Sequence, residues 1–320
     1  MGFISVIVTA HNRKKFINDA LNSLFRQTLN KEKFEIILIS NFKLDSSDVI
    51  NIYNDKEEIG EKIYAGFQEA KGNIVCFLDD DDIFEENKLE RVLSLCSPEC
   101  SYYHNNLLPI NEKGKEIEIK ADYLKIPPYA TLRKINYPLI IEDSAKINVK
   151  KVLKLNANFN SSSICVNRKI LERNLSYLSK IKVLIDSFLF YSSFTYNGKI
   201  ILDPERLTYY RIHTSQTSSG KLSDIKEYRE SFSRLLLKVL DDMRVIKDML
   251  NGNLENIIEE EISRYILLYN IFSFNKKYNQ NIKFKRELAW YYFISLAPSF
   301  IKKLYIKKEF KKRNKLLNYQ

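Results

Sequence analysis

Four consecutive aspartates, Asp79 to Asp82, follow the apolar run Ile74–Leu78. Carboxylates crowded at the end of a buried strand repel one another, so a positive charge is expected close by. A hard divalent cation bound by carboxylate oxygens supplies such a charge, and Mg²⁺ keeps coordination positions open for phosphate oxygens. The alternative is a solvated acidic turn that caps a helix starting near Glu85, because Asp is favoured at helix N-termini. The acidic run therefore indicates either a metal–diphosphate site or a helix cap.

The acidic run ends the third of three strand-like segments in the first 100 residues. Continuous apolar runs of this length are typical of strands buried on both faces of a sheet. The expected strands are Phe3–Thr9, Phe34–Ile39 and Ile74–Leu78. Apolar residues at helical spacing lie between them, after Asn12 and again over Glu57–Ala70. We expect Asn12 to cap the first helix and Gly72 to end the second.

This alternation of strands and helices predicts an α/β fold with a mostly parallel sheet flanked by helices. In such sheets ligands bind beyond the carboxyl ends of the strands, where the loops that carry Thr9, Asn41 and Asp79 would meet. The C-terminal part shows helical patterns over residues 223–250, 254–274 and 284–316. We therefore expect a helical extension after the α/β part.

The positive charge of the chain lies at its C-terminal end. The net charge is +11, and residues 281–320 contain eleven Lys or Arg against Glu287 and Glu309. Aromatic residues over 289–301, with the chain's single Trp at position 290, precede a dense run of lysines. This combination predicts that residues 284–320 contact a membrane, with a helix in the interface near anionic head groups. The alternative is a helix packed on the protein with a solvated lysine face. No base-stacking motif accompanies the charge, so a nucleic-acid partner is not expected.

The cysteines and apolar segments bear on the compartment. Cys76, Cys96, Cys100 and Cys165 lack the spacing of a metal site, and buried free thiols are expected, which suits a reducing compartment. The apolar stretch Phe3–Ala10 is too short for a signal peptide. The longest uncharged run has 14 residues, fewer than the roughly 18–20 that span a bilayer. We expect a cytoplasmic protein that is peripheral on the cytoplasmic face of the cell membrane.

Several segments in sequence order resemble the family 2 glycosyltransferases of the GT-A fold. They are Ser5–Arg13, Ala20–Thr28, Phe34–Ile39, Ala70–Asp82, Asp186–Phe190 and Tyr209–Ser218, and together they cover about residues 3–218. The resemblance implies an inverting sugar transfer from a nucleotide-diphosphate donor, linked to UDP or GDP, to a hydroxyl of a glycan or lipid-linked acceptor. It also implies Mn²⁺ or Mg²⁺, which would neutralise the charge that builds on the leaving diphosphate. We expect residues 1–110 to bind the nucleotide sugar, residues 111–220 to bind the acceptor, and residues 221–320 to form the basic helical region.

The resemblance also implies roles for individual residues. Asp81 corresponds to the metal-binding acid of the family's Asp-x-Asp motif, and His213 to a histidine that closes over the metal or diphosphate. The nucleotide would contact residues of three loops. These are Thr9, Ala10, His11, Asn41, Asp79 and Asp80.

Asp186 corresponds to the family's general base, which takes the proton of the acceptor hydroxyl. The alternative is that Asp186 is an N-terminal cap of the helix-like segment that follows. Glu142 and Asp143 are a rival pair, but they precede the Asn160–Ser163 segment, whereas the family's base follows its equivalent.

The segment Ser40–Phe42 departs from the family pattern, in which an acidic residue contacts the nucleobase. The amide of Asn41 can both accept and donate, so it does not distinguish uracil from guanine. Arg211 could pair with a phosphate or with a surface carboxylate. Two other functions remain open. One is a non-catalytic carbohydrate-binding or scaffold protein of this fold. The other is a sugar nucleotidyltransferase, although its glycine-rich N-terminal loop is missing here.

Overall fold

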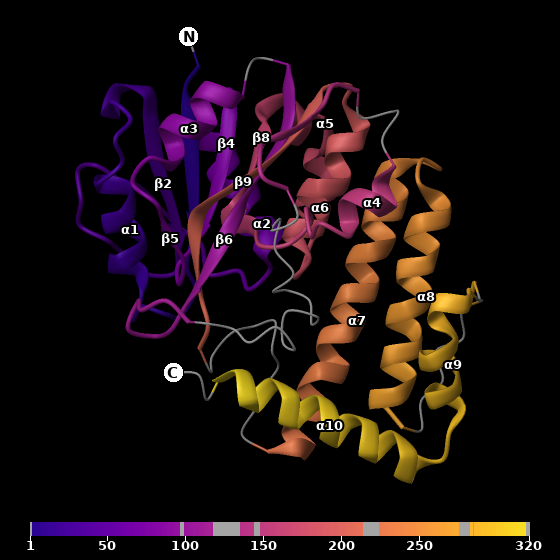
Figure 1. The fold of residues 1–320 in the computed structure, drawn as a ribbon. Coiled ribbons are helices and arrows are strands. Elements are labelled where there is room, and N and C mark those ends of the chain that lie inside the picture. The colour runs from indigo at the N-terminus through magenta and orange to yellow at the C-terminus, as the bar shows by residue number, and fades with distance from the viewer. Residues whose placement is uncertain are drawn as a thin grey trace. The chain divides into compact units, whose positions relative to one another are not determined.

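The computed structural model describes residues 2–96, 99–117, 135–143, 148–213, 224–274, 282–283 and 285–317. The chain forms two compact units. Unit 1 contains Met1–Ile110 and Gly114–Arg211, and unit 2 contains Asn111–Lys113 and Ile212–Gln320. The strands and most of the shorter helices belong to unit 1, and unit 2 contains four helices among the described residues (Figure 1).

The first half of unit 1 is a parallel sheet with three helices. Its strands are β1 (Ile4–Thr9), β2 (Phe34–Ser40), β3 (Ile50–Tyr53) and β4 (Ile74–Asp79), and its helices are α1 (Ile17–Phe25), α2 (Ile59–Glu69) and α3 (Lys88–Leu95). β1 pairs with β2 on one side and with β4 on the other, so that Thr9 lies beside Asp79. The three predicted strands and both helices of this region are confirmed.

The second half of unit 1 makes the sheet mixed. Its elements are β5 (Ile83–Phe84), β6 (Cys100–Ile110), β7 (Leu139–Ile141), α4 (Val149–Leu153), β8 (Ile164–Asn167), α5 (Arg168–Leu178), α6 (Ile185–Ser192) and β9 (Lys199–Arg211). The strand order is β3-β2-β1-β4-β8-β6-β9-β5, and β7 pairs with β9. β8 is antiparallel to β4 and β6, whereas β6 and β9 are parallel. The predicted α/β fold, with a central sheet flanked by helices, is confirmed, although the sheet is mixed where we expected it to be mostly parallel.

Both faces of the sheet are covered, which explains the uninterrupted apolar strands. Side chains of a strand alternate between the two faces. Val6 and Val8 of β1 pack with α1 and α3 on one face, whereas Ile7 and Ile39 point toward Gly66 of α2 on the other. Each residue of β1 is therefore buried.

Two predicted helix ends are wrong. α1 begins at Ile17, after Phe16, and Asn12 instead pairs with Asn41 in the loop before it. Gly72 is not a left-handed cap of α2: a Cβ atom there would lie 2.4 Å from the backbone nitrogen of Ser5. Glycine is required at that position because β1 passes too close for any side chain.

The cysteines also differ from the prediction. Cys76 of β4 and Cys165 of β8 form a disulfide across this strand pair. Cys96 and Cys100 are buried, with their Sγ atoms 2.9 Å apart. The expectation of four free thiols is therefore wrong for Cys76 and Cys165, and the argument for a reducing compartment loses that support.

Unit 2 consists of α7 (Ile225–Leu250), α8 (Glu255–Phe272), α9 (Ala289–Leu296) and α10 (Ser299–Leu317). Its core is lined by Tyr228, Leu236, Leu240, Ile266, Tyr269, Ile271, Phe272, Ile294 and Ile306. The predicted helix over 284–316 is instead two helices. Ala297 is extended ahead of Pro298, because a residue that precedes proline avoids the helical conformation. None of the described helices is both long enough and apolar enough to cross a bilayer.

Candidate active site

The acidic run lies at the carboxyl edge of β4, where a tight turn follows the strand. The N–H of Asp82 donates to the carbonyl of Asp79 at 3.2 Å, and α3 begins only at Lys88, after Asn87. The four aspartates are therefore not the N-terminal cap of a helix, and that alternative is wrong. One carboxylate oxygen from each of Asp79, Asp81 and Asp82 lies within 4.8 Å of the other two.

Asp79 is held in place from two sides. Its carboxylate accepts from the hydroxyl of Ser161 at 2.8 Å and from that of Thr9 at 3.4 Å, while its N–H donates to the hydroxyl of Ser162 at 3.1 Å. Burial and the neighbouring Asp81 raise the pKa of Asp79 to about 6. The strand β1 and the segment before β8 thus orient the first carboxylate of the run.

Asp82 is the most completely buried of the four, with 1% of its surface exposed. It accepts from the side-chain amide of Asn160 at 2.9 Å and from the N–H of Arg211 at 3.0 Å. Burial, together with Asp81 and Asp79, raises its pKa well above the ordinary value. A bound cation would relieve this cost, because an opposite charge favours the ionised carboxylate. The three-acid cluster offers only hard oxygen ligands, so it fits Mg²⁺ or Mn²⁺.

Arg13 supplies a positive charge that the sequence did not reveal. Its guanidinium forms an ion pair with Asp80 and lies 3.0 Å from Asp81. Burial still raises the pKa of Asp80 to about 7, with Asp81 adding to the rise and Arg13 opposing it. Asp80 therefore faces a cation of the chain itself, and Asp82, to which the sequence assigned no role, joins Asp79 and Asp81 in the cluster.

Asp186 lies in the first turn of α6 and is connected to the acidic cluster through Asn160. Its carboxylate accepts from the N–H of Ser187 at 2.8 Å and from the N–H of Asn160 at 3.3 Å. Asn160 has a φ of 66°, which is rare for a residue with a side chain, and its amide also holds Asp82. Burial raises the pKa of Asp186 to about 6. Strained residues of this kind gather at functional sites.

The rival pair Glu142 and Asp143 lies elsewhere. Glu142 is exposed and forms an ion pair of 2.9 Å with Lys199, the first residue of β9. The acidic cluster contacts Arg211, at the other end of the same strand. The length of β9 therefore separates this pair from the cluster.

Arg211 is the last residue of β9, and His213 follows it by two residues in the chain. Arg211 is fully buried, binds the carbonyl of Asp81 at 2.8 Å and forms an ion pair of 2.8 Å with Asp19. The sequence predicted either a phosphate or a surface carboxylate as the partner of Arg211, and the structure shows the carboxylate of Asp19. Through this ion pair Arg211 connects α1 to the acidic turn. His213 is also buried but belongs to unit 2, so its place beside the metal stays a prediction. The rest of that motif, residues 214–218, lies outside the described residues.

Lys88, the first residue of α3, is fully buried. Its ammonium group donates to the carbonyl of Ser162 and, at 2.9 Å, to the hydroxyl of Thr208, and it lies 3.7 Å from the centre of the Phe84 ring. Burial lowers its pKa well below the ordinary value. Ser162 in turn binds Asp79, so Lys88 supports the segment that orients the cluster. A lysine in an amphipathic helix gave no sequence signal for this role.

The residues expected to contact the nucleotide lie on neighbouring loops. The N–H of Ala10 donates to the carbonyl of Ile39 at 2.9 Å, which joins β1 to β2. The N–H of Asn12 donates to the amide oxygen of Asn41 at 3.0 Å, and the amide nitrogen of Asn41 donates back to Asn12. Nδ1 of His11 is buried and has no hydrogen-bond partner. Nucleotide contacts by these residues stay predictions.

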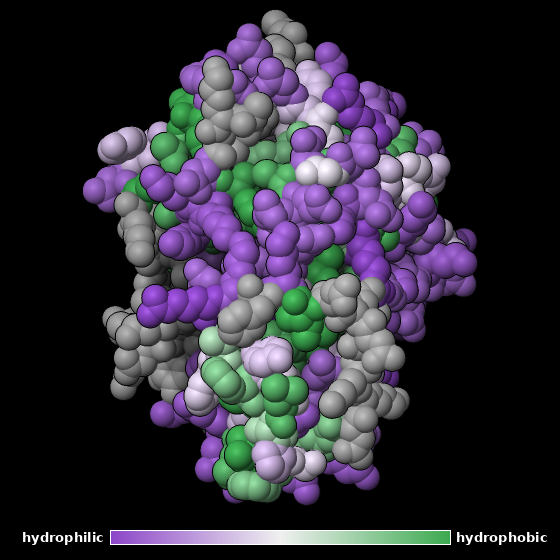
Figure 2. Space-filling view, turned by 90° about the vertical axis from the view of Figure 1, so that its right-hand side faces the viewer, coloured by the Kyte–Doolittle hydropathy of each residue, from purple (hydrophilic) through white to green (hydrophobic). Residues whose placement is uncertain are grey.

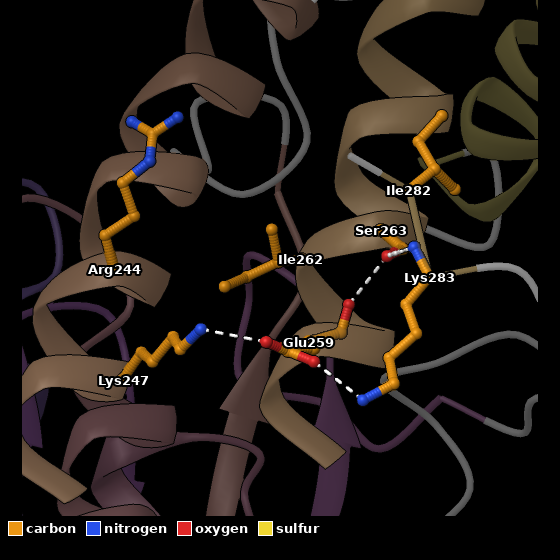
Figure 3. Close-up of a pocket in the computed structure, with 7 residues that line it drawn as sticks. All are labelled: Arg244, Lys247, Glu259, Ile262, Ser263, Ile282 and Lys283. Carbon is orange, nitrogen blue, oxygen red and sulfur yellow. Dashed lines mark hydrogen bonds and ion pairs between the residues drawn. The ribbon is translucent and has the colours of Figure 1, made fainter. Parts of the chain in front are cut away.

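A cavity of ≈ 490 Å³ lies in unit 2 between α7 and α8 (Figure 3). Its lining includes Lys247 and Lys283, which bind Glu259 at 2.9 and 2.8 Å. These bonds lower the pKa of Glu259 to about 2. Because the charges of this cavity satisfy one another, we assign it no ligand.

The chain is similar in sequence to known glycosyltransferases. Residues 5–141 match the family model described as glycosyl transferase family 2. The chain is 25% identical over 244 residues to an uncharacterized glycosyltransferase of Nostoc sp., which covers 70% of this chain and 69% of that protein.

Solved structures of two proteins share the fold. Residues 1–349 of TarS from S. aureus align over 99% of this chain and 90% of that one, with 14% identity and a TM-score of 0.52. A TarS complex with UDP-GlcNAc gives a TM-score of 0.51 at 15% identity, also over 99% and 90% of the two chains. A mannosyltransferase of Pyrobaculum calidifontis, in complex with GDP-Man and Mn²⁺, aligns over 99% and 87%, with 12% identity and a TM-score of 0.51. These likenesses show that the chain shares the fold of those proteins.

Proposed function

We propose that this protein is an inverting, metal-assisted glycosyltransferase. It transfers a sugar from a UDP- or GDP-linked donor to a hydroxyl of a glycan or lipid-linked acceptor. One observation carries the proposal: three carboxylate oxygens lie within 4.8 Å of one another at the carboxyl edge of β4, and Asn160 connects them to Asp186. The family match over residues 5–141 supports it.

The metal would be held by Asp81, together with Asp79 and Asp82, and we propose His213 as a further ligand. Bound there, Mn²⁺ or Mg²⁺ supplies positive charge to the departing diphosphate. Arg13 keeps Asp80 and Asp81 paired with a cation. Lys88 and the serines of 161–163 keep the carboxylates oriented, so little rearrangement is needed when the donor binds.

Asp186 acts as the general base. The acceptor oxygen attacks the anomeric carbon from the face opposite the diphosphate, the bond from that carbon to the diphosphate oxygen breaks, and the acceptor proton moves to the carboxylate of Asp186. A pKa of about 6 makes this carboxylate more basic than an ordinary aspartate while it remains ionised at neutral pH. One displacement inverts the configuration of the carbon.

The nucleotide lies beyond β1 and β2 in this proposal. Thr9, Ala10 and His11 contact the base and ribose, and the orphaned Nδ1 of His11 offers an acceptor or donor there. Asn41 reads the base only if its amide pair with Asn12 opens. Neighbours of this fold bind UDP-GlcNAc and GDP-Man, so both nucleotides remain candidates.

The test is slow hydrolysis of a panel of UDP- and GDP-sugars with Mn²⁺, combined with calorimetric titration of UDP and GDP. We expect one nucleotide to bind only when the metal is present and its sugar to be hydrolysed. An Asp81→Asn variant is the control and should lose both. Absence of nucleotide binding with Mn²⁺ present would contradict the proposal and favour a non-catalytic protein. None of the relatives described above is a nucleotidyltransferase or a scaffold protein.

A further inference from the structure

Large apolar side chains are exposed on α9 and on the first two turns of α10. We call these residues the apolar patch. They are Trp290, Phe293, Leu296, Phe300, Ile301 and Leu304. The exposed fraction is 66% for Trp290 and 67% for Phe293. Figure 2 shows hydrophobic surface gathered on the C-terminal helices. Contiguous exposed apolar surface of this kind marks an interaction site.

Exposed lysines continue the same surface along α10. We call them the basic stripe, and they are Lys303, Lys307, Lys308, Lys311 and Lys315. Residues three or four apart share one face of a helix, so Phe300, Leu304, Lys308 and Lys311 form one line. The outward face of α10 is therefore apolar at its start and basic toward its end.

The opposite side of α10 is already used for packing. Ile306 is buried in the core of unit 2, and the ring of Phe310 lies 5.5 Å from that of Tyr228. Lys302 turns inward, where its ammonium group donates to the carbonyl of Asn270 at 3.2 Å and to that of Phe274 at 3.4 Å, near the end of α8. Because this inner face already anchors the helix, the apolar patch is not needed to hold α10 on unit 2.

We propose that the apolar patch and the basic stripe together dock unit 2 on an anionic lipid bilayer. Trp and Phe insert at the boundary between head groups and acyl chains, and a neighbouring row of lysines is attracted by anionic head groups. Charge complementarity favours lipid over a second copy of the chain, since a symmetric contact would bring two basic stripes together. The purpose of docking, which is to bring the enzyme to a lipid-linked acceptor, rests on the proposed function; the docking itself does not.

The chain contains a single tryptophan, and it lies in the patch, so Trp290 reports docking directly. The full-length protein is mixed with vesicles of phosphatidylcholine alone or with phosphatidylglycerol added. We expect the Trp290 emission to move to shorter wavelength, and the protein to float with the vesicles, only when the anionic lipid is present. High salt should weaken this binding, because it screens the attraction of the lysines.

Two double variants separate the contributions and leave the reporter in place. Phe293→Ser with Phe300→Ser should abolish the emission shift. Lys307→Glu with Lys311→Glu should lower partition into anionic vesicles by about tenfold or more. The matched controls are Tyr53→Ser with Tyr137→Ser, two exposed aromatic residues of unit 1, and Lys31→Glu with Lys33→Glu. Both control proteins should bind as the unaltered protein does.

Three outcomes would overturn docking on lipid. They are the absence of an anionic-lipid-dependent shift, equal losses in the control variants, and a lipid-free dimer that Phe293→Ser with Phe300→Ser dissociates in light scattering. Circular dichroism confirms that each variant is folded. Hydrolysis of the donor should persist in the patch variants, and an Asp186→Asn variant should still float. Failure of docking is thereby distinguished from failure of the proposed function.

Discussion

The acidic edge of unit 1 and the basic stripe of unit 2 are both crowded with like charges. They differ in what reduces the repulsion between those charges. Asp82 is 1% exposed and its carboxylate accepts two hydrogen bonds, whereas the lysines of the stripe lie in water. Buried charges need a partner at a fixed position, and exposed charges are screened by solvent. In the proposed roles, the position of each carboxylate decides metal binding at the acidic edge, whereas the summed charge of the lysines decides docking through α10.

The largest effect is expected at the cluster itself. Asp81→Asn removes one ligand and one charge from the metal site while the residue keeps its size. Loss of several kcal/mol of stabilisation of the departing diphosphate lowers transfer by about 10³-fold or more. Transfer rates across a Mn²⁺ titration measure this. If the variant transfers sugar at the normal rate at every Mn²⁺ concentration, the carboxylate of Asp81 is not required at this edge of the sheet.

Asp186→Asn should reduce transfer by about 10²- to 10⁴-fold and leave the affinity for the nucleotide unchanged, because the base acts only on the acceptor proton. In the unaltered protein the rate should fall as the pH drops through about 6, where Asp186 becomes protonated. Single-turnover rates between pH 5 and 8 test both points. Ser187→Ala, whose side chain is adjacent to the base, is the control and should retain the profile.

Stability supplies a further contrast between a buried and an exposed lysine. Lys88→Met removes two buried hydrogen bonds, to the carbonyl of Ser162 and to the hydroxyl of Thr208, which costs about 1–3 kcal/mol of unfolding free energy. Lys307→Met on the basic stripe should change it by no more than about 0.5 kcal/mol. Urea denaturation of both variants measures the difference. Equal values for the two lysines would mean that burial does not govern their contributions.

A further effect concerns the pH dependence of folding. The pKa of Asp186 is raised from 3.8 to about 6, so the folded protein holds this proton more tightly than the unfolded chain does. Its contribution to stability is therefore largest below about pH 4 and declines as the pH rises through 6, by at most about 3 kcal/mol. Asp186→Asn removes this decline. Thermal melts of both proteins at pH 4 to 8, with a chelator present, isolate the contribution.

Sequence patterns predicted the elements around the site better than the contacts within it. The apolar runs of β1, β2 and β4 predict buried strands. An acidic run directly after β4 must therefore lie at the carboxyl edge of the sheet. Arg13, Lys88 and Asn160 gave no such signal, because a lone polar residue next to a loop or on a helix is usually solvated. Asn41 matched a family position, yet it is paired with Asn12, a partner that only the meeting of two loops reveals.

By itself the sequence determined that β4 ends in four carboxylates and that aromatic residues precede a row of lysines near the C-terminus. Both features follow from the types of neighbouring residues and from their spacing along the chain. The tertiary structure decided which carboxylates form the cluster, that Asn160 joins Asp82 to Asp186, and which face of α10 is left outside. Its contacts join residues far apart in the chain, so the register of the sheet and the packing of helices govern them. Such distances in sequence are beyond the reach of any local pattern.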